Sequence, residues 1–292
     1  MKIPYRHSKL LWSYLFVAPT MLMFAVFIGL PLVTSVLLAF QQNVLGEAVW
    51  VGLDNFRRLF ADYVFSIALK NTALYTLAVV TQNVLIALVA ATLIQSLSRR
   101  WQSFFRSAFY LPIVTSTVII SMVFRWMFHP QHGLFNLILM SLGREPIFWL
   151  ADPDLALWSI ILSEVLTAPG TSIVLFCAAL DRVPKTLYEA ADIDGASGFR
   201  KWWSITLPLL KPSLLYVLVM NTIGTFQVFS RVHVMTGGGP GYATTTLVQL
   251  IYNTAFRDFN FGFASAQALF LFVIIATISL LQFKFLSTDV EY

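Results

Sequence analysis

The sequence predicts an all-α membrane protein with six transmembrane helices. Of its 292 residues, 58% are hydrophobic and only 11% are charged, whereas soluble domains carry about 25% charged residues. Uncharged apolar runs recur along the chain, and roughly 20 apolar residues suffice for a helix to cross a bilayer. This composition excludes the soluble globular classes of protein.

The six helices are expected, in chain order, at 14–40, 69–95, 106–128, 155–180, 209–232 and 262–285. Each centres on a run without Asp, Glu, Lys or Arg, except that Glu164 interrupts the fourth. The first run exceeds 30 residues and no small-residue cleavage pattern follows it, so we expect a retained helix rather than a signal peptide. The single cysteine, Cys177, lies inside the fourth span, which excludes an intrachain disulfide. We interpret residues 1–292 as one transmembrane domain.

The distribution of positive charge predicts the orientation of these spans. If the N-terminus is cytoplasmic, 12 of the 19 Lys and Arg residues, beginning with Lys2, fall on the cytoplasmic side and 7 fall outside. This is the bias that the positive-inside rule requires. Both termini and the segment 184–208 are therefore expected in the cytoplasm, and the net charge of +5 indicates orientation rather than nucleic-acid binding.

Three longer connections, 49–62, 129–154 and 236–260, are expected on the outer side. The third is rich in glycine, but the chain has no Gly-Lys dipeptide and therefore no GxxxxGK(S/T) nucleotide-binding loop. His129 and His132 have no carboxylate or cysteine at ligand spacing, so no metal site is expected.

The inner segment 184–208 concentrates charge in a chain that otherwise has little of it. Pro184 can occupy the first turn of a helix, on which Lys185, Glu189 and Asp192 would share one face. Gly195 then permits a turn, after which FRKWWSITLP leads back toward the membrane. The expected form is helix, turn, helix, and it suits either a connector on the lipid surface or a docking surface.

The same segment carries a motif. EAA at 189–191, Gly195 after three intervening residues, and ITLP at 205–208 after nine more resemble the EAA signature of the membrane subunits of bacterial ABC importers. Other stretches are similar to the sugar-importer permeases of the maltose and glycerol-3-phosphate type, namely YLFVAPTMLMFAVFIGLPLVTSVLLAF, VGLDNFRRLF, FYLPIVTSTVIISMVFRWMF and GGGPGYATTTLVQLIYNTAF. The resemblance covers essentially the whole chain, and VGLDNF with GGGPGYATTTLV looks like the first of the two permeases that such importers pair.

The resemblance implies a type I ABC importer permease fold in the bacterial cytoplasmic (inner) membrane. In that family the EAA loop is a coupling helix that lies in a groove on a separate ATPase, which assigns this role to Glu189, Ala190, Ala191, Asp192, Gly195, Leu207 and Pro208. The implied partners are a second EAA-type permease, the ATPase, an external substrate-binding protein, a carbohydrate and membrane lipid, with no nucleic acid. The chain would be non-catalytic and hold no cofactor, because ATP and Mg would bind the ATPase.

Polar side chains inside membrane spans are costly and so indicate function. Glu164 is the only acidic residue deep in an apolar span, and Pro169 with Gly170 weakens the helix beside it. Two polar faces at helical spacing flank the inner loop, and by their offset from the motif they resemble the sugar-holding helices of the maltose-type permeases, although a carboxylate is not a fixed feature of those sites. They predict a substrate path formed by Glu164, Thr167, Thr171, Asn221, Gly224, Thr225 and Gln227.

Structural roles remain open for the same residues. Glu164 could instead be hydrogen-bonded or ion-paired between helices, for example with an arginine near the membrane surface. The Asn and Thr side chains could form interhelical hydrogen bonds. Four further residues are expected to be packing polar groups: Asn71, Gln82, Asn83 and Gln267. Monosaccharides, oligosaccharides and polyols all suit such side chains. A phosphate ester is disfavoured, because Glu164 would repel it and no deep basic residue offsets that charge.

The leading hypothesis is therefore a transmembrane permease subunit of an ATP-driven carbohydrate importer. The alternative is an ion-driven secondary transporter in which Glu164 carries a proton or sodium ion, and it predicts transport by this chain alone in liposomes. A membrane-embedded enzyme lacks support, because the sequence has no His/Asp/Glu cluster or nucleophile-base pair at motif spacing.

Overall fold

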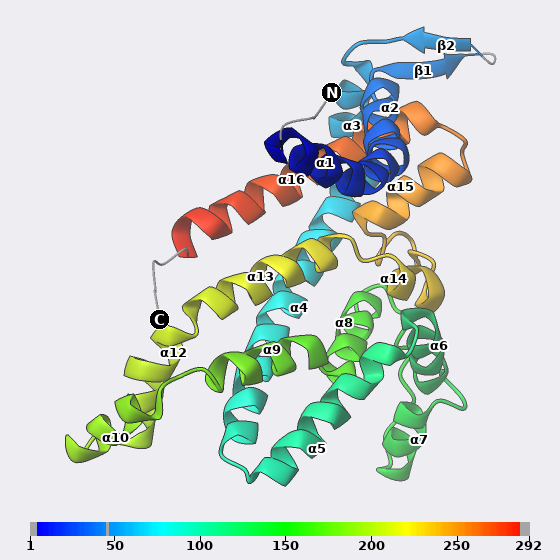
Figure 1. Ribbon diagram of the computed structural model, residues 1–292. Coiled ribbons are helices and arrows are strands. Elements are labelled where there is room, and N and C mark those ends of the chain that lie inside the picture. Colours follow the sequence, from blue (N-terminus) through cyan, green and yellow to red (C-terminus); the bar gives the residue numbers. More distant parts are fainter. Residues whose placement is uncertain (1–4, 45–46, 287–292) are drawn as a thin grey trace. The chain divides into compact units, whose positions relative to one another are not determined.

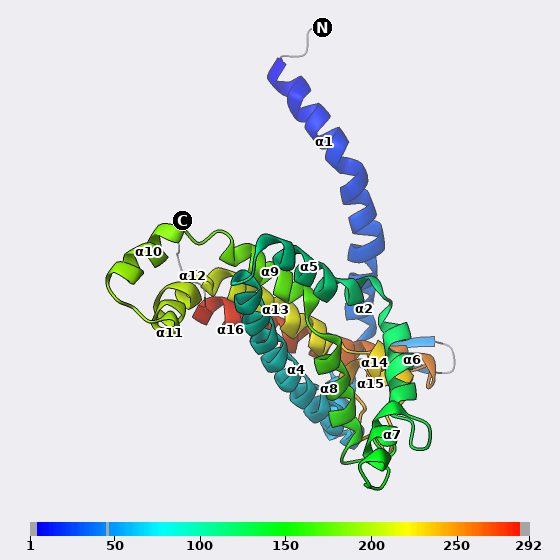
Figure 2. The same cartoon turned by 90° about the horizontal axis from the view of Figure 1, so that it is seen from below.

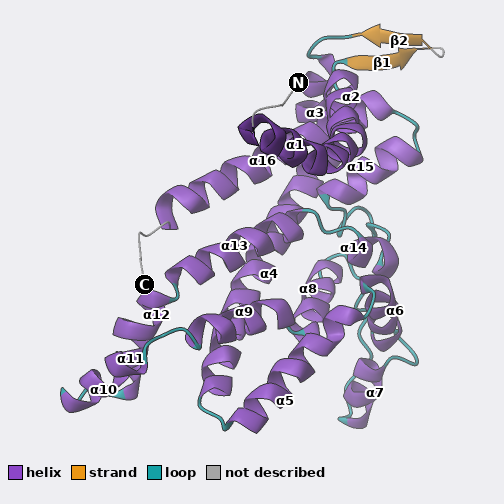
Figure 3. Ribbon diagram, viewed as in Figure 1, coloured by secondary structure: helices purple, strands orange, loops and turns teal. Residues whose placement is uncertain are grey.

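The computed structural model describes residues 5–44 and 47–286, which are helical apart from one short hairpin and the connecting loops (Figure 3). The chain divides into two compact units. We call residues up to 61 together with 251–270 the N-terminal unit, and residues 62–250 together with those from 271 onward the main unit. Lys2, which was counted for the orientation, lies outside the described residues.

The N-terminal unit begins with one long apolar helical segment. It consists of α1 (Tyr5–Phe24), a π-helical turn η1 (Ala25–Gly29) and α2 (Leu30–Leu38). The π turn ends two residues before Pro31, which lacks a backbone N–H, and the Leu30 N–H donates to the Ala25 carbonyl five residues back. No residue of the apolar window in Trp12–Leu38 is buried by the rest of the chain.

The remainder of the N-terminal unit is a small folded cluster. It contains the antiparallel hairpin β1 (Gln41–Val44) and β2 (Glu47–Trp50), helix α3 (Asp54–Ala61), and parts of α15 (Leu247–Phe256) and α16 (Phe261–Leu286). The buried Asn55 amide donates to the Ala39 and Gln41 carbonyls, both at 2.9 Å. A Cβ at Gly262 would overlap the Gln41 carbonyl oxygen, so only glycine allows α16 to approach there.

The main unit is built around α4 (Tyr63–Gln95), whose N-terminus is capped by the Asp62 carboxylate. Helix α4 packs against α8 (Ala156–Thr167), α9 (Gly170–Leu180) and α13 (Lys211–Phe226). Its Ala87 and Ala91 are fully buried, and such small residues let helix backbones approach closely. Figure 1 shows these four helices together.

The other helices of the main unit surround this centre. They are α5 (Arg99–Tyr110), the 3-10 turn η2 (Leu111–Val114), α6 (Thr117–Met127), α7 (Leu134–Ser141) and α14 (Ser230–Met235). The inner loop supplies α10 (Lys185–Ile193), α11 (Gly198–Lys201), the π turn η3 (Trp202–Thr206) and α12 (Leu207–Leu209). In Figures 1 and 2, α10 and α11 lie at one end of the main unit, and α6 and α14 lie at the other.

Four helices are long and apolar enough to cross a membrane, and the number rises to six if each of two bent pairs is one span. The four single helices are Trp12–Leu38, Tyr63–Gln95, Lys211–Met235 and Phe261–Phe285. The expected span 106–128 is bent by 92°, because Pro112 lies in the 3-10 turn and Ser116 starts a new helix as its N-cap. The expected span 155–180 is bent by 43° at Ala168 and Pro169.

Candidate functional site

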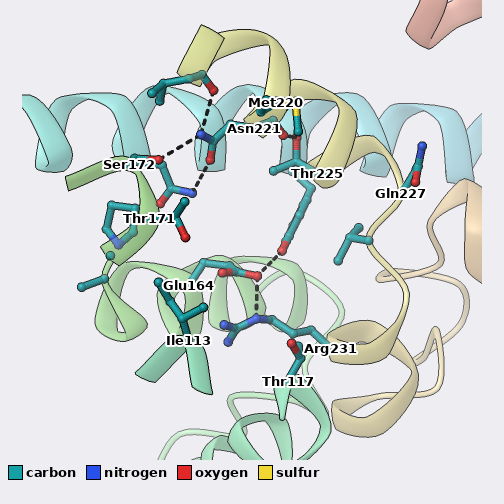
Figure 4. A pocket seen from close by; sticks show the side chains of 18 of the residues that line it. Ile113, Thr117, Glu164, Thr171, Ser172, Met220, Asn221, Thr225, Gln227 and Arg231 are labelled. Atoms are coloured by element: carbon teal, nitrogen blue, oxygen red, sulfur yellow. Dashed lines mark hydrogen bonds and ion pairs between the residues drawn. The ribbon is translucent and has the colours of Figure 1, made fainter. Parts of the chain in front are cut away.

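A cavity of about 530 Å³ opens in the main unit where two helices are interrupted. Its walls come from the junction between α8 and α9, from residues 216–225 of α13, and from residues 227–231, with contributions from α4, η2 and α6 (Figure 4). This volume lies within the range of small-molecule sites, roughly 300–1,000 Å³.

The junction between α8 and α9 is fixed by local backbone chemistry. Proline disfavours helical geometry in the preceding residue, and Ala168 before Pro169 has a φ of 59°, in the left-handed region. Gly170 then lies so close to α5 that a Cβ at this position would overlap the Phe109 carbonyl. Only glycine therefore fits there. The break turns the start of α9, with Thr171 and Ser172, toward the cavity.

Glu164 lies in the cavity wall as part of an ion pair. Its Oε1 atom is 2.5 Å from the Nε atom of Arg231 and accepts a hydrogen bond of 2.7 Å from the Tyr75 hydroxyl. The Arg231 side chain is 5% exposed and also donates to the Ser163 and Thr167 hydroxyls, at 3.0 and 3.2 Å. The expectation that no deep basic residue offsets Glu164 is therefore wrong. Arg231 was counted with the outer connections because it stands near the end of the fifth span.

Asn221 forms the second polar centre of the cavity. Its amide donates to the Ser172 hydroxyl at 3.2 Å and to the Val217 carbonyl at 2.8 Å, while its carbonyl accepts from the Asn83 amide at 3.1 Å. The Thr225 hydroxyl donates to the Asn221 backbone carbonyl at 2.8 Å. These bonds fix the amide and link α4, α9 and α13 at the cavity wall.

Six of the seven residues predicted for the substrate path line this cavity: Glu164, Thr171, Asn221, Gly224, Thr225 and Gln227. The exception is Thr167, whose hydroxyl donates to the Ser163 carbonyl and accepts from Arg231. The predicted face from Glu164 to Thr171 assumed an unbroken helix, and the bend at Ala168 breaks it. The sequence reasoning missed Tyr75 and Ser172, and it allowed for an arginine beside Glu164 without identifying Arg231. It took Asn83 for a packing group, although Asn83 also lines the cavity.

The other polar residues singled out from the sequence lie away from the cavity. Asn71 donates to the Tyr242 and Thr245 carbonyls, which holds the glycine-rich connection against α4. The Gln82 and Gln267 amide nitrogens are buried. The His129 Nδ1 atom accepts from the backbone of the following turn, and within the described residues no group of His, Cys, Asp and Glu could hold a metal ion.

The inner loop has the expected helix, turn and helix. Gly195 takes a φ of 72° at the turn, and Asp192 forms an ion pair of 2.6 Å with Lys201 across it. The Tyr188 and Thr206 hydroxyls lie 2.8 Å apart, and the Trp202 indole donates to the Thr92 hydroxyl on α4. These contacts tie the loop to itself and to the membrane helices.

Much of the surface of the inner loop is exposed. Ala190 and Glu189 are exposed, while Ala191, Leu207 and Pro208 are partly buried. Within the described chain, no hydrogen bond or ion pair reaches the Glu189 carboxylate. Large apolar side chains accompany it, since Ile193 is 88% exposed and Phe199 is 75% exposed. An uncovered surface that combines a free carboxylate with exposed apolar groups is typical of a protein interface.

A second ion pair joins α5 to the end of α9. Arg106 of α5 donates to both carboxylate oxygens of Asp181, at 2.8 and 3.1 Å. Hydrogen bonding to this guanidinium lowers the pKa of Asp181 from its ordinary value. Because the Asp181 side chain is 43% exposed, solvent screening limits the pair's contribution to stability.

This pair predicts a small acid-dependent loss of stability. A carboxylate whose pKa is lowered on folding stabilises the folded state fully at pH values above its unfolded pKa, which is about 3.9. This contribution is lost as the pH falls through the folded pKa. Asp181→Asn should therefore unfold at nearly the parental temperature at pH 7 and show a smaller shift on acidification below pH ~4. Thermal unfolding in detergent at both pH values measures this. An equal acid shift in both proteins would show that the pair does not titrate as described.

Comparison with known proteins agrees with this architecture. Residues 83–291 match the family described as binding-protein-dependent transport system inner membrane component. The chain is 35% identical over 283 residues to the probable ABC transporter permease protein YurN of Bacillus subtilis, covering 95% of this chain and 97% of the relative. It is also 35% identical over 280 residues to the arabinooligosaccharides transport system permease protein AraP of that species, with 95% and 89% covered.

The fold has a solved counterpart. A chain in the crystal structure of a bacterial ABC transporter involved in the import of the acidic polysaccharide alginate superposes with a TM-score of 0.84 at 24% identity, covering 95% of this chain and 94% of that one. The helices, the cavity at their interruptions and the family match lead to one conclusion. The chain belongs to the family of binding-protein-dependent transport system inner membrane components.

Proposed function

We propose that this chain is the transmembrane permease subunit of an ATP-driven importer that carries a sugar or related carbohydrate across the bacterial cytoplasmic membrane. The observation that carries the proposal is near full-length similarity to permeases, including one for arabinooligosaccharides. The cavity supports it, because amides, hydroxyls and a carboxylate line it beside apolar groups, as sugar hydroxyls and ring faces require.

The ion-driven alternative is not supported. It needs the charge of Glu164 to be available to a proton or sodium ion, whereas the Arg231 guanidinium already balances that charge. Family membership also favours a permease that works with other subunits.

The inner loop provides the coupling surface in this proposal. The exposed EAA segment on α10 would lie in a groove of a separate cytoplasmic ATPase, which binds ATP and Mg, so that this chain is non-catalytic. Both termini would then be cytoplasmic, and the second permease and the external binding protein would complete the importer. Closure of the ATPase subunits would move α10 and switch the membrane helices between inward-open and outward-open states.

Reconstitution tests the proposed function. The chain should copurify with a second EAA-type permease and an ATPase, and this complex should import sugar only with ATP and the binding protein. The chain alone in liposomes should transport nothing. Sugar transport by the purified chain alone, without ATP, would overturn the proposal.

The cavity side chains should be required for uptake. Thr225→Val and Asn221→Ala each remove a polar group that would bond a sugar hydroxyl. A buried polar group left without its partner costs about 1–3 kcal/mol, so sugar uptake should fall about tenfold or more while the complex still assembles. Thr222→Val is a matched control on the same helix, because Thr222 does not line the cavity. Equal uptake by the Thr225→Val and Thr222→Val importers would remove this face from the substrate path.

A further inference from the structure

The charge inside the cavity is confined to one pair. Among the described residues that line it, Glu164 and Arg231 are the two that carry charge, and the remaining polar groups are neutral amides and hydroxyls. The wall is therefore electrically balanced, and whether either charge is available to a ligand depends on what each already contacts.

The positive charge of Arg231 is already neutralised by a partner within the protein. All three nitrogens of the Arg231 guanidinium lie near oxygens of α8: Nε near the Glu164 carboxylate, and the two terminal nitrogens near the Ser163 and Thr167 hydroxyls. The side chain is 5% exposed. An acidic group on a ligand would have to compete with Glu164 for this cation, and it would lose its hydration without gaining a new counter-ion.

The carboxylate, in contrast, keeps an oxygen for a ligand. Both of its contacts end on Oε1, and within the described chain no hydrogen bond reaches Oε2. In Figure 4 that second oxygen lies on the Thr171 side of the cavity. The Glu164 side chain is 22% exposed, and an ionised carboxylate only accepts hydrogen bonds. A hydroxyl donor is the complementary ligand group, and a second anion is repelled.

We propose that this cavity selects uncharged sugars over acidic ones, with Glu164 Oε2 accepting a sugar hydroxyl. Arg231 and Tyr75 are positioning residues that hold Glu164 through Oε1. Asn221, Thr171 and Thr225 complete a neutral set of partners for further hydroxyls. The proposal rests on the proposed function and narrows its substrate class, which the sequence left open among sugars, polyols and, less favoured, phosphate esters.

The test uses the complete importer in proteoliposomes with matched sugars. Galactobiose and digalacturonate differ by a hydroxymethyl group against a carboxylate on each ring, and lactose, arabinotriose and glycerol-3-phosphate extend the panel. The parental importer should take up neutral sugars at least tenfold faster than acidic ones. Since one binding protein serves all samples, the change in the acidic-to-neutral uptake ratio on substitution reports the permease itself.

Glu164→Gln keeps the shape of the side chain and removes its charge, leaving Arg231 uncompensated. Uptake of the neutral sugar should fall about tenfold or more, since hydrogen bonds to charged groups are the stronger ones, and the acidic-to-neutral ratio should rise. Glu145→Gln makes the same chemical change in an exposed loop and should alter neither the neutral uptake nor the ratio.

An unchanged ratio in Glu164→Gln, or parental uptake of acidic sugars at the neutral rate, overturns the inference while leaving carbohydrate import intact. If Glu164→Gln does not assemble, the double variant Glu164→Gln with Arg231→Met, which removes both charges, is tested by the same ratio, and an unchanged ratio there overturns the inference. Failure of every sugar to enter, with an active ATPase, counts against both proposals.

Discussion

Replacing Arg231 by methionine is expected to lower the free energy of unfolding of the assembled importer by about 3–5 kcal/mol, the usual cost of breaking a buried ion pair from one side. The substitution leaves the Glu164 carboxylate with the Tyr75 hydroxyl as its remaining partner in the described chain, and it also strips the Ser163 and Thr167 hydroxyls of a donor. Thermal unfolding of the purified complex in detergent, together with its yield from membranes, measures the loss.

Two further variants separate the ion pair from side-chain size. The double variant Arg231→Met with Glu164→Gln removes both charges, so it should recover most of the lost stability. Arg125→Met is the matched control, because Arg125 is exposed and makes a single hydrogen bond of 3.3 Å to the Val234 carbonyl. A single Arg231→Met variant as stable as the parent would mean that the pair does not hold α14 against α8.

The sequence predicted the membrane helices well where the signal is local. An uncharged run marks each span except the fourth, which Glu164 interrupts, and α4 and α16 follow their runs closely. The form of the inner loop could also be predicted from the sequence, because Pro184 stands at the start of its first helix and Gly195 at the turn that follows. Such features depend on residues near one another in the chain, so periodicity and turn chemistry suffice to place them.

The bends and the ion pair needed tertiary information. Pro112 and Pro169 indicate in the sequence that a helix is interrupted, but a proline alone does not predict the angle at which the helix resumes. The angles are 92° at the first break and 43° at the second. Likewise, Arg231 stands at the edge of its span, and only the packing of α14 against α8 brings it to Glu164. Tyr75 gave no signal, because a tyrosine in an apolar helix is usually core and its partner lies on another helix.

The exposed carboxylate of the inner loop should be needed for coupling and not for folding. Glu189→Ala removes a charge that has no partner within the described chain, so membrane insertion and thermal stability should match the parent. If the ATPase pairs with this carboxylate, truncation of one side of an interfacial charge pair costs about 2–5 kcal/mol. Substrate-stimulated ATP hydrolysis and uptake should then both fall more than tenfold. Asp194→Ala, at the exposed end of α10, is the matched control.

The turn after α10 should matter for the same reason, through geometry rather than charge. Gly195 has a φ of 72°, a conformation that costs other L-residues about 1–2 kcal/mol and β-branched ones more, whereas Gly198 begins α11 with no positive φ and open space around it. Gly195→Val should therefore displace α10 and reduce coupled transport, while Gly198→Val should retain most of it. Crosslinking of Ala191→Cys to the ATPase should weaken in the first variant and persist in the second. Normal coupling in both Gly195→Val and Glu189→Ala would show that this loop is a surface connector and that force passes to the membrane helices elsewhere.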